Sequence, residues 1–224
     1  MKRLILGIDD AGRGPVIGPM ILAGCLLDDK IETELRRLGV RDSKQLSPRR
    51  REFLAKEIKD KAIAFKVVTS SPLEIERMNK KDIKLNEVEA IKAAKIIDDL
   101  NDGKNKIKVV IDCPSVSIIR WTDYLKTKIK NLSNIEISCE HKADRNHVSV
   151  SAASIIAKSR REVEMDKIRL KYGNEVGSGY PSDPLTVEFL KKNANKYSED
   201  GIFRRTWKTW QKAASMTEQE KLNF

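Results

Sequence analysis

The sequence is poor in the residues on which many metal sites and disulfides depend. Of its 224 residues, two are histidines and three are cysteines. Cys25, Cys113 and Cys139 form no pair at metal-ligand spacing, so we expect no zinc site. An odd number of cysteines without such spacing is typical of reduced thiols in a cytosolic protein.

Long apolar runs are also missing. No stretch of the sequence is long enough to span a membrane. Met1 stands only a few residues before the first expected strand, so we expect no signal peptide. These features predict a cytoplasmic protein with no membrane partner, and we take a monomer as the simplest assembly.

Positive charge is what the sequence has in excess. The formal net charge is +11, which fits a nucleic acid or another acidic partner. A solvated lysine-rich surface explains the same charge equally well. The apolar fraction of 40% is enough for a real core, and the length suits one large domain or a domain with a small extension.

Apolar and amphipathic segments alternate along the chain in a way that predicts an α/β domain around a mixed five-stranded sheet. We expect strands at 4–9, 16–27, 64–71, 107–114 and 135–141. We expect helices at 32–39, 47–62, 85–100 and 149–172, and a basic aromatic helix over 203–214. We assign residues 1–176 to the main domain and 177–224 to a helical C-terminal extension, whose first helix is capped by Asp183.

Four aspartates follow the ends of predicted strands. Asp9 and Asp10 close the first strand in GIDDAGRGP (residues 7–15), Asp112 closes a later apolar strand, and Asp144 precedes the long helix. Active sites of open α/β sheets gather at such strand ends. Four carboxylates in one place repel one another unless divalent cations lie between them. A pair of such ions about 4 Å apart is the usual means of hydrolysing a phosphodiester.

Each acid taken alone has a structural alternative. Asp112 before Cys-Pro is typical of a turn cap, and Asp144 is typical of a helix-entry residue or an ion-pair partner. The adjacent pair is harder to explain in this way. Neighbouring residues of a strand point to opposite faces, so one of the two acids should face inward unless the strand ends or bends there.

Together with the acids, seven blocks of the chain resemble type 2 ribonuclease H (ribonuclease HII). They follow the family's order and cover nearly the whole chain, in a pattern similar to archaeal members. The blocks are DDAGRGPVIGP (9–19), GVRDSKQLSPRRRE (39–52), LNEVEAIKAA (85–94), IDCPS (111–115), HKADRNHVSVSAASIIAKSRRE (141–162), GSGYPSDPLT (177–186) and RRTWKT (204–209).

The resemblance implies a ribonuclease H-like fold with a helical C-terminal extension. It implies hydrolysis of the RNA strand of RNA–DNA hybrids, and incision on the 5′ side of single ribonucleotides in DNA with 3′-hydroxyl and 5′-phosphate products. The family's catalytic and metal-binding acids fall on Asp9, Asp10, Asp112 and Asp144. They would hold Mg²⁺ or Mn²⁺, two ions with substrate bound.

The same resemblance implies a reader of the ribose 2′-hydroxyl at Gly12, Arg13 and Gly14. Glycines allow a backbone to approach a ligand closely, and the 2′-hydroxyl is what distinguishes an RNA sugar from a DNA sugar. Taken alone, Gly-Arg-Gly also fits an ordinary tight turn. The family's substrate tyrosine falls on Tyr180, which would stack under the neighbouring deoxyribose; its alternative is a loop tyrosine packed on the core.

Several further residues are candidates for substrate contacts, chiefly to phosphate: Ser43, Lys44, Asn86, Lys142, Lys158 and Arg161. A single lysine is more often a solvated surface residue, and Asn86 also fits a helix N-cap. The basic aromatic segment 203–212 could lie along the hybrid backbone. The alternative is that Trp207 and Trp210 anchor the extension.

One position departs from the family's pattern, and two other functions compete with this one. The second acid of the family is usually glutamate, whereas Asp10 is one methylene shorter. Type 3 ribonuclease H is the close enzymatic alternative, but it usually has an extra N-terminal domain and a glutamate as its fourth acid, where this chain has Asp144. Type 1 is disfavoured, because it takes its second acid from a distant helix. A hybrid-binding protein without catalysis is the alternative from another class. The C-terminal QEKLNF (219–224) resembles the peptides with which some members bind the sliding clamp.

Overall fold

The computed structural model describes residues 3–40 and 46–222, with side chains through Ser215, and these residues form two compact units. The first unit holds the described parts of Met1–Ala11, Ile21–Val68 and Leu85–Ser159. The second holds Gly12–Met20, Thr69–Lys84 and the described part of Arg160–Phe224. No helix among these residues is long and apolar enough to cross a membrane.

The first unit is built on a five-stranded sheet with the order β3-β2-β1-β4-β5. β1 runs antiparallel to β2 and parallel to β4, and β4 runs parallel to β5. The mixed sheet expected from the sequence is therefore confirmed. The strands are β1 (Leu4–Ala11), β2 (Met20–Asp28), β3 (Ala64–Ser70), β4 (Ile107–Asp112) and β5 (Ile135–Glu140).

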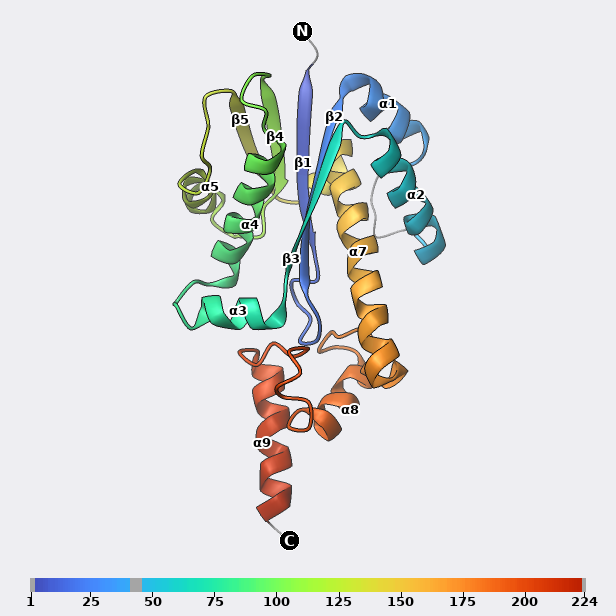
Figure 1. Cartoon of the computed structure of the whole chain (residues 1–224), viewed down its shortest axis with the longest axis vertical. Helices are drawn as coiled ribbons and strands as arrows, with labels where there is room; N and C mark the ends of the chain where they lie inside the picture. The colour runs from blue at the N-terminus through green and yellow to red at the C-terminus, as the bar shows by residue number, and fades with distance from the viewer. Residues whose placement is uncertain (1–2, 41–45, 223–224) are drawn as a thin grey trace. The chain divides into compact units, whose positions relative to one another are not determined.

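Helices cover this sheet in the first unit, with α1 and α2 on one side of the view in Figure 1 and α4 and α5 on the other. Alternate residues of β2, from Ile21 to Leu27, share one buried core with α1, α2 and the N-terminal half of α7. The helices are α1 (Asp29–Arg37), α2 (Pro48–Lys61), α3 (Pro72–Asn79), α4 (Leu85–Leu100), α5 (Ile118–Lys126), α6 (Ala143–Asn146), α7 (Val148–Tyr172), α8 (Pro184–Asn193) and α9 (Lys208–Leu222).

Two glycines let helices approach the sheet closely. A Cβ atom on Gly24 of β2 would lie 2.3 Å from Ile96 Cγ2 of α4. A Cβ atom on Gly7 of β1 would lie 2.1 Å from the backbone of Ser149, at the start of α7. Because real Cβ contacts are much longer, any side chain at Gly7 would push α7 away from β1. The start of α7 therefore packs directly against the strand that carries Asp9.

The second unit has its own core, and it includes a segment far upstream of the C-terminal region. Val16 and Ile17 are fully buried there with Phe189 and Phe203, and Ile17 pairs with Phe203 as an isolated β-bridge. The expected boundary at 176/177 therefore differs from the boundaries of the compact units. The C-terminal region buries its aromatic residues against the Gly12–Met20 segment, so the two segments belong to one core.

The structure corrects several expected elements. Residues 16–19 are not part of the second strand, which begins at Met20, because Val16 and Ile17 serve the second unit's core. The basic aromatic helix begins at Lys208 and not at residue 203. Trp207 and Trp210 pack against the second unit's core, as the anchoring alternative expects. Helices α3 and α5 were not expected, although Ser71 and Pro72 supply an N-cap and an N1 proline for α3.

Candidate active site

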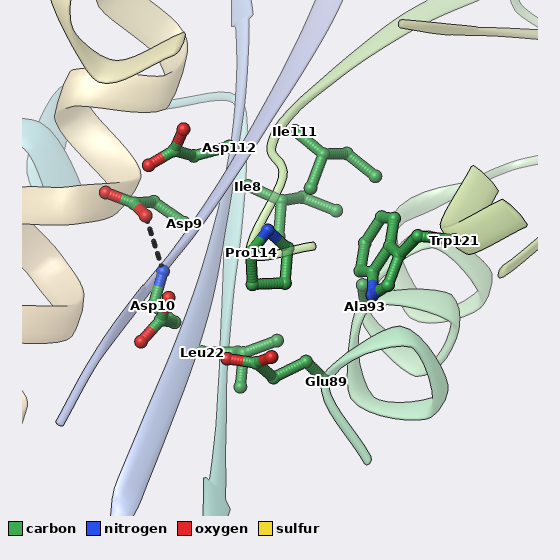
Figure 2. Close-up of a pocket in the computed structure, with 10 residues that line it drawn as sticks. All are labelled: Ile8, Asp9, Asp10, Leu22, Glu89, Ala93, Ile111, Asp112, Pro114 and Trp121. Carbon is green, nitrogen blue, oxygen red and sulfur yellow. Dashed lines mark hydrogen bonds between the residues drawn. The ribbon is translucent and has the colours of Figure 1, made fainter. Parts of the chain in front are cut away.

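The first unit brings three of the four predicted acids into one pocket at the ends of β1 and β4. Asp9 and Asp10 lie near the end of β1, and Asp112 is the last residue of the neighbouring parallel strand. Figure 2 shows their carboxylates on the same side of these strands, away from Trp121. The pocket is lined by Ile8, Asp9, Asp10, Leu22, Glu89, Ala93, Ile111, Asp112, Pro114 and Trp121.

The carboxylate of Asp9 is buried, with 6% of the residue exposed. Its Oδ1 atom accepts the backbone N–H of Asp10 at 2.7 Å, and the hydroxyl of Ser154 on α7 provides another hydrogen bond. Burial raises the pKa of Asp9 well above its ordinary value, and the charges of Asp10 and Asp112 raise it further, against these hydrogen bonds. A positive charge placed here would remove that penalty.

Asp112 also connects the pocket with the segment that carries Asp144. Its Oδ1 atom accepts the backbone N–H of Ala143, the first residue of α6, at 3.1 Å. Just before it, Lys142 has φ +59° and ψ +36°, a left-handed conformation that is strained for a residue with a side chain. Asp112 thus holds the start of α6, which is distant in the sequence, and it lines the pocket as well.

Asp144 is almost completely buried, with 3% of the residue exposed. Its Oδ1 atom has no hydrogen-bond partner among the described residues. Leaving a buried carboxylate oxygen without a partner is costly. Asp144 is not among the residues that line the pocket in Figure 2, so the structure groups three of the acids and places the fourth beyond the Ala143 link.

The chemistry of these acids fits a hard divalent cation. Carboxylate oxygens are the ligands that Mg²⁺ and Mn²⁺ prefer. The unpartnered oxygen of Asp144 and the raised pKa of Asp9 are both features that a bound cation would relieve. Within residues 3–40 and 46–222, no three His, Cys, Asp or Glu side chains already stand as a metal-binding group.

Two residues of this region were not singled out from the sequence. Glu89 of α4 is 2% exposed and lines the pocket opposite the aspartates in Figure 2. Ser154 of α7 is fully buried and hydrogen-bonds Asp9. Both lie inside blocks that resemble the family. For Ser154 the signal in the sequence was a small polar residue in a largely apolar stretch, whereas Glu89 lies among other charged residues and gave no such signal.

The second unit brings the Gly-Arg-Gly segment and Tyr180 together. Gly12 is buried with φ +82°, and a Cβ atom there would lie 2.6 Å from Arg161 Cδ, so the position requires glycine. Gly14 is exposed, and a Cβ atom on it would lie 3.6 Å from Cε1 of the Tyr180 ring. Tyr180 is 38% exposed, so its ring is not a packed core residue.

Arg161 joins the two parts of this arrangement from the interior of the second unit. The residue is 9% exposed, its guanidinium lies 4.9 Å from the Tyr180 ring centre, and Nη2 donates to Ser178 O at 2.8 Å. Val16 N–H donates to Gly179 O at 2.8 Å, which ties the two loops together again. Arg161 was expected as a phosphate contact; the structure places it as a buried support for Tyr180.

The remaining candidate contacts are scattered. Asn86 lies in the first turn of α4, where its carbonyl accepts Trp121 Nε1–H at 2.8 Å, and it does not cap the helix. Lys142 is exposed and Lys158 is partly buried. Ser43 and Lys44 lie outside the described residues, as do the last two residues of the segment 219–224.

Comparison with known proteins shows the family to which the chain belongs. The family model described as Ribonuclease HII matches residues 6–210. The chain belongs to the ribonuclease HII family. A ribonuclease HII from Methanothermobacter thermautotrophicus is 41% identical over 210 residues, which cover 93% of this chain and 98% of that one.

Solved structures of the family show the same fold. The ribonuclease H2 of Pyrococcus horikoshii OT3 matches with a TM-score of 0.86 and 38% identity, covering 96% of this chain and 99% of that one. A PCNA:RNase HII complex from Archaeoglobus fulgidus matches with a TM-score of 0.80 and 38% identity, covering 92% of this chain and 95% of that one. The chain is thus an endoribonuclease of ribonuclease H type 2, a divalent-metal-dependent family that acts on RNA–DNA hybrids.

The burial of Asp9 gives the first testable prediction. In metal-free buffer at neutral pH, Asp9→Asn should raise Tm by a few degrees, because it removes a buried charge beside Asp10 and Asp112. The gain should shrink as the pH falls from the raised folded-state pKa of Asp9 toward about 4, and it should be absent below that, where the carboxyl is protonated in both the folded and unfolded states. Millimolar Mg²⁺ should raise the Tm of the parent more than that of the variant.

The matched control is Asp123→Asn, which changes an exposed aspartate of α5. Its Tm should follow that of the parent at each pH and Mg²⁺ concentration, measured by circular dichroism. A lower Tm for Asp9→Asn in metal-free neutral buffer, together with an unchanged response to Mg²⁺, would show that Asp9 carries no such penalty.

Proposed function

We propose that this chain hydrolyses the RNA strand of RNA–DNA hybrids and also incises duplex DNA on the 5′ side of a single embedded ribonucleotide, leaving 3′-hydroxyl and 5′-phosphate ends. The observation that carries this proposal is the packing of Gly14 beside the Tyr180 ring. The Gly-Arg-Gly segment begins two residues after Asp10 along the chain. The segment proposed to recognise a single ribose therefore directly follows the strand that bears Asp9 and Asp10.

The residues of this chain have two tasks in the proposed reaction. Backbone groups of Gly12, Arg13 and Gly14 bind the 2′-hydroxyl, because the exposed Gly14 has no side chain to block the approach of a sugar. The ring of Tyr180 offers an exposed flat face on which the neighbouring deoxyribose can pack. A DNA sugar at the same place lacks the hydroxyl, so it leaves the reader's polar groups without a partner.

Asp9, Asp10, Asp112 and Asp144 would hold two Mg²⁺ or Mn²⁺ ions. When bound, such ions make a water molecule nucleophilic and stabilise the leaving oxygen of a phosphodiester. The acids would hold these ions for attack at the phosphate on the 5′ side of the recognised ribonucleotide. The buried position of Asp9, against α7, keeps its carboxylate in a fixed orientation through Ser154 and the Asp10 N–H.

Further parts of the proposal concern the setting of the reaction. We expect a monomer in the cytoplasm that removes ribonucleotides from DNA. Because the relative from Archaeoglobus fulgidus was solved as a PCNA:RNase HII complex, we also propose that residues 219–224 bind a sliding clamp. Helix α9 extends through Leu222, into this segment.

Incision of a defined duplex tests the proposed function. The parent chain, incubated with Mg²⁺ or Mn²⁺ and a DNA duplex containing one ribonucleotide, should cut on the 5′ side of that ribonucleotide. The matching all-DNA duplex should stay intact, because it offers no 2′-hydroxyl to the Gly12–Gly14 segment. Products are resolved on a sequencing gel. Cutting of both duplexes at similar rates would contradict the proposal, and a shifted complex without product would favour the non-catalytic hybrid-binding protein.

The length of the second acid gives another prediction. Mg²⁺ requires near-octahedral geometry with oxygens at about 2.1 Å, and the family usually places a glutamate where this chain has Asp10. Asp10→Glu should therefore raise kcat in Mg²⁺, on the order of 10- to 100-fold, because small misplacements in such sites cost about that much. In Mn²⁺ the difference in kcat between the parent and Asp10→Glu should be smaller than in Mg²⁺.

Substrate binding is the control for this comparison. The Kd of the parent and of Asp10→Glu for the ribonucleotide-containing duplex should agree closely, since the proposed sugar contacts are elsewhere. Equal or lower kcat for the glutamate form in Mg²⁺ would mean that this chain has adapted to the shorter acid.

A further inference from the structure

Arg204 is a completely buried arginine that ties together the two ends of the Gly12–Gly18 loop. Its guanidinium donates from Nε to Gly18 O at 3.1 Å, from Nη1 to Arg13 O at 2.7 Å and from Nη2 to Gly12 O at 2.5 Å. Its backbone N–H donates to Val16 O at 2.9 Å. A single residue thus binds four carbonyls of one loop.

The guanidinium is held in place by its own surroundings in the second unit. It lies 5.1 Å from the ring centre of Trp207, a contact that favours a planar cation. The preceding residue, Phe203, is fixed by its β-bridge to Ile17. Because arginine presents several N–H groups in a rigid plane, it can serve three carbonyls at once, which the single flexible ammonium of lysine cannot do in the same geometry.

The contacts to Gly12 O and Arg13 O determine how the reader faces its ligand. In a trans peptide the N–H points away from the C=O, so the N–H groups of Arg13 and Gly14 point away from Arg204. A hydrogen bond at a carbonyl also polarises its peptide and strengthens the N–H of the same peptide as a donor. Arg204 therefore sets both the direction and the strength of the donors that the proposed function assigns to the 2′-hydroxyl.

We propose that Arg204 is a positioning residue for ribonucleotide recognition: it contacts no substrate and acts by holding the Gly12–Gly14 backbone in its reading conformation. This inference rests on the proposed function of that segment. It also narrows that function, since the carbonyls of Gly12 and Arg13 are directed to the guanidinium and the N–H groups of the same two peptides point the opposite way.

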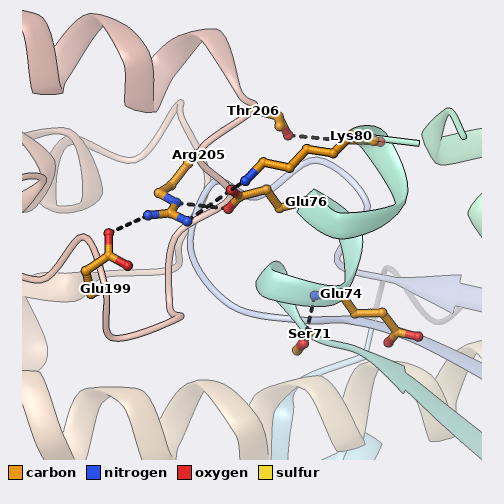
Figure 3. A network of polar contacts seen from close by, with 8 residues as sticks. Ser71, Glu74, Glu76, Lys80, Glu199, Arg205 and Thr206 are labelled. Atoms are coloured by element: carbon orange, nitrogen blue, oxygen red, sulfur yellow. Dashed lines mark hydrogen bonds and ion pairs between the residues drawn. The ribbon is translucent and has the colours of Figure 1, made fainter. Parts of the chain in front are cut away.

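Arg205 offers a matched control in the adjacent position. It donates to Glu76 through Nε at 2.9 Å and Nη2 at 3.0 Å, and to Glu199 through Nη1 at 2.6 Å (Figure 3). Glu76 is buried and also pairs with Lys80 at 2.9 Å. Arg205 thus stabilises the same C-terminal region, and the side-chain partners of its guanidinium among the described residues are the carboxylates of Glu76 and Glu199. The same Arg→Lys change at 204 and at 205 therefore separates recognition from general stability.

The test compares binding of two duplexes that differ by a single 2′-hydroxyl. Parent, Arg204→Lys and Arg205→Lys are titrated in EDTA against a DNA duplex with one ribonucleotide and against its all-DNA counterpart. The Kd for the all-DNA duplex divided by the Kd for the ribonucleotide duplex reports recognition of the hydroxyl alone. We expect the ratio of Arg204→Lys to fall about tenfold or more below that of the parent, with affinity for all-DNA unchanged. Arg205→Lys should keep the parent's ratio, even if its Tm falls as far.

The other outcomes would contradict either the proposed sugar recognition or the role of Arg204. A parent ratio near one would remove the proposed reader, and with it this inference. If the parent clearly prefers the ribonucleotide duplex and Arg204→Lys keeps that preference, the inference alone is overturned. The same holds if Arg205→Lys lowers the ratio of Kd values as much as Arg204→Lys does.

A measurement on the parent covers the case in which Arg204→Lys does not fold. The Arg204 Nε–H should exchange slowly with solvent by NMR, and the Arg13 and Gly14 amide signals should shift on adding the ribonucleotide duplex but not the all-DNA duplex. Fast exchange of Arg204 Nε–H, or equal shifts with both duplexes, would overturn the inference.

Discussion

The burial of the Asp9 carboxylate beside two other acids is the constraint on which the catalytic unit depends. Desolvation and the charges of Asp10 and Asp112 all raise its pKa. A fold that uses its sheet to hold such a group must stabilise it locally, and it does so with the Ser154 hydroxyl and the Asp10 N–H. The close approach of α7 to Gly7 brings Ser154 into reach. Cations bound at this pocket, as proposed above, would relieve the remaining cost.

The proposed recognition of the sugar in the second unit depends on two buried guanidinium groups. Arg161 supports Tyr180, and Arg204 holds the carbonyls of the Gly12–Gly18 loop. Both guanidinium groups are directed to backbone oxygens, which fixes loops that would otherwise be mobile for lack of regular hydrogen bonds. The chain passes from one unit to the other between Ala11 and Gly12, so the acids and the sugar reader are consecutive in the sequence.

The sequence predicted the sheet and the three pocket aspartates because both follow from local patterns. Apolar runs that end in an acid specify a buried strand and the residue at its end, as at Asp9 and Asp112. It failed at 16–19 and 203–207, where apolar and aromatic residues satisfy a core formed by segments nearly 200 positions apart. It also missed Glu89 and Ser154, since only the packing of α4 and α7 decides which way a polar residue on a helix faces. The hydrogen bonds of Arg204 to the Gly12–Gly18 loop had no local signal in the sequence.

The most direct test of the account is the position of bound metal in crystals soaked with Mn²⁺. Anomalous diffraction locates the ions independently of any assumption about the side chains. The account predicts density in the pocket of Figure 2, bounded by the carboxylates of Asp9, Asp10 and Asp112, with Asp144 completing the ligands. Mn²⁺ bound elsewhere, with this pocket empty in a preparation that cleaves its substrate, would contradict the claim that these buried acids are the catalytic centre.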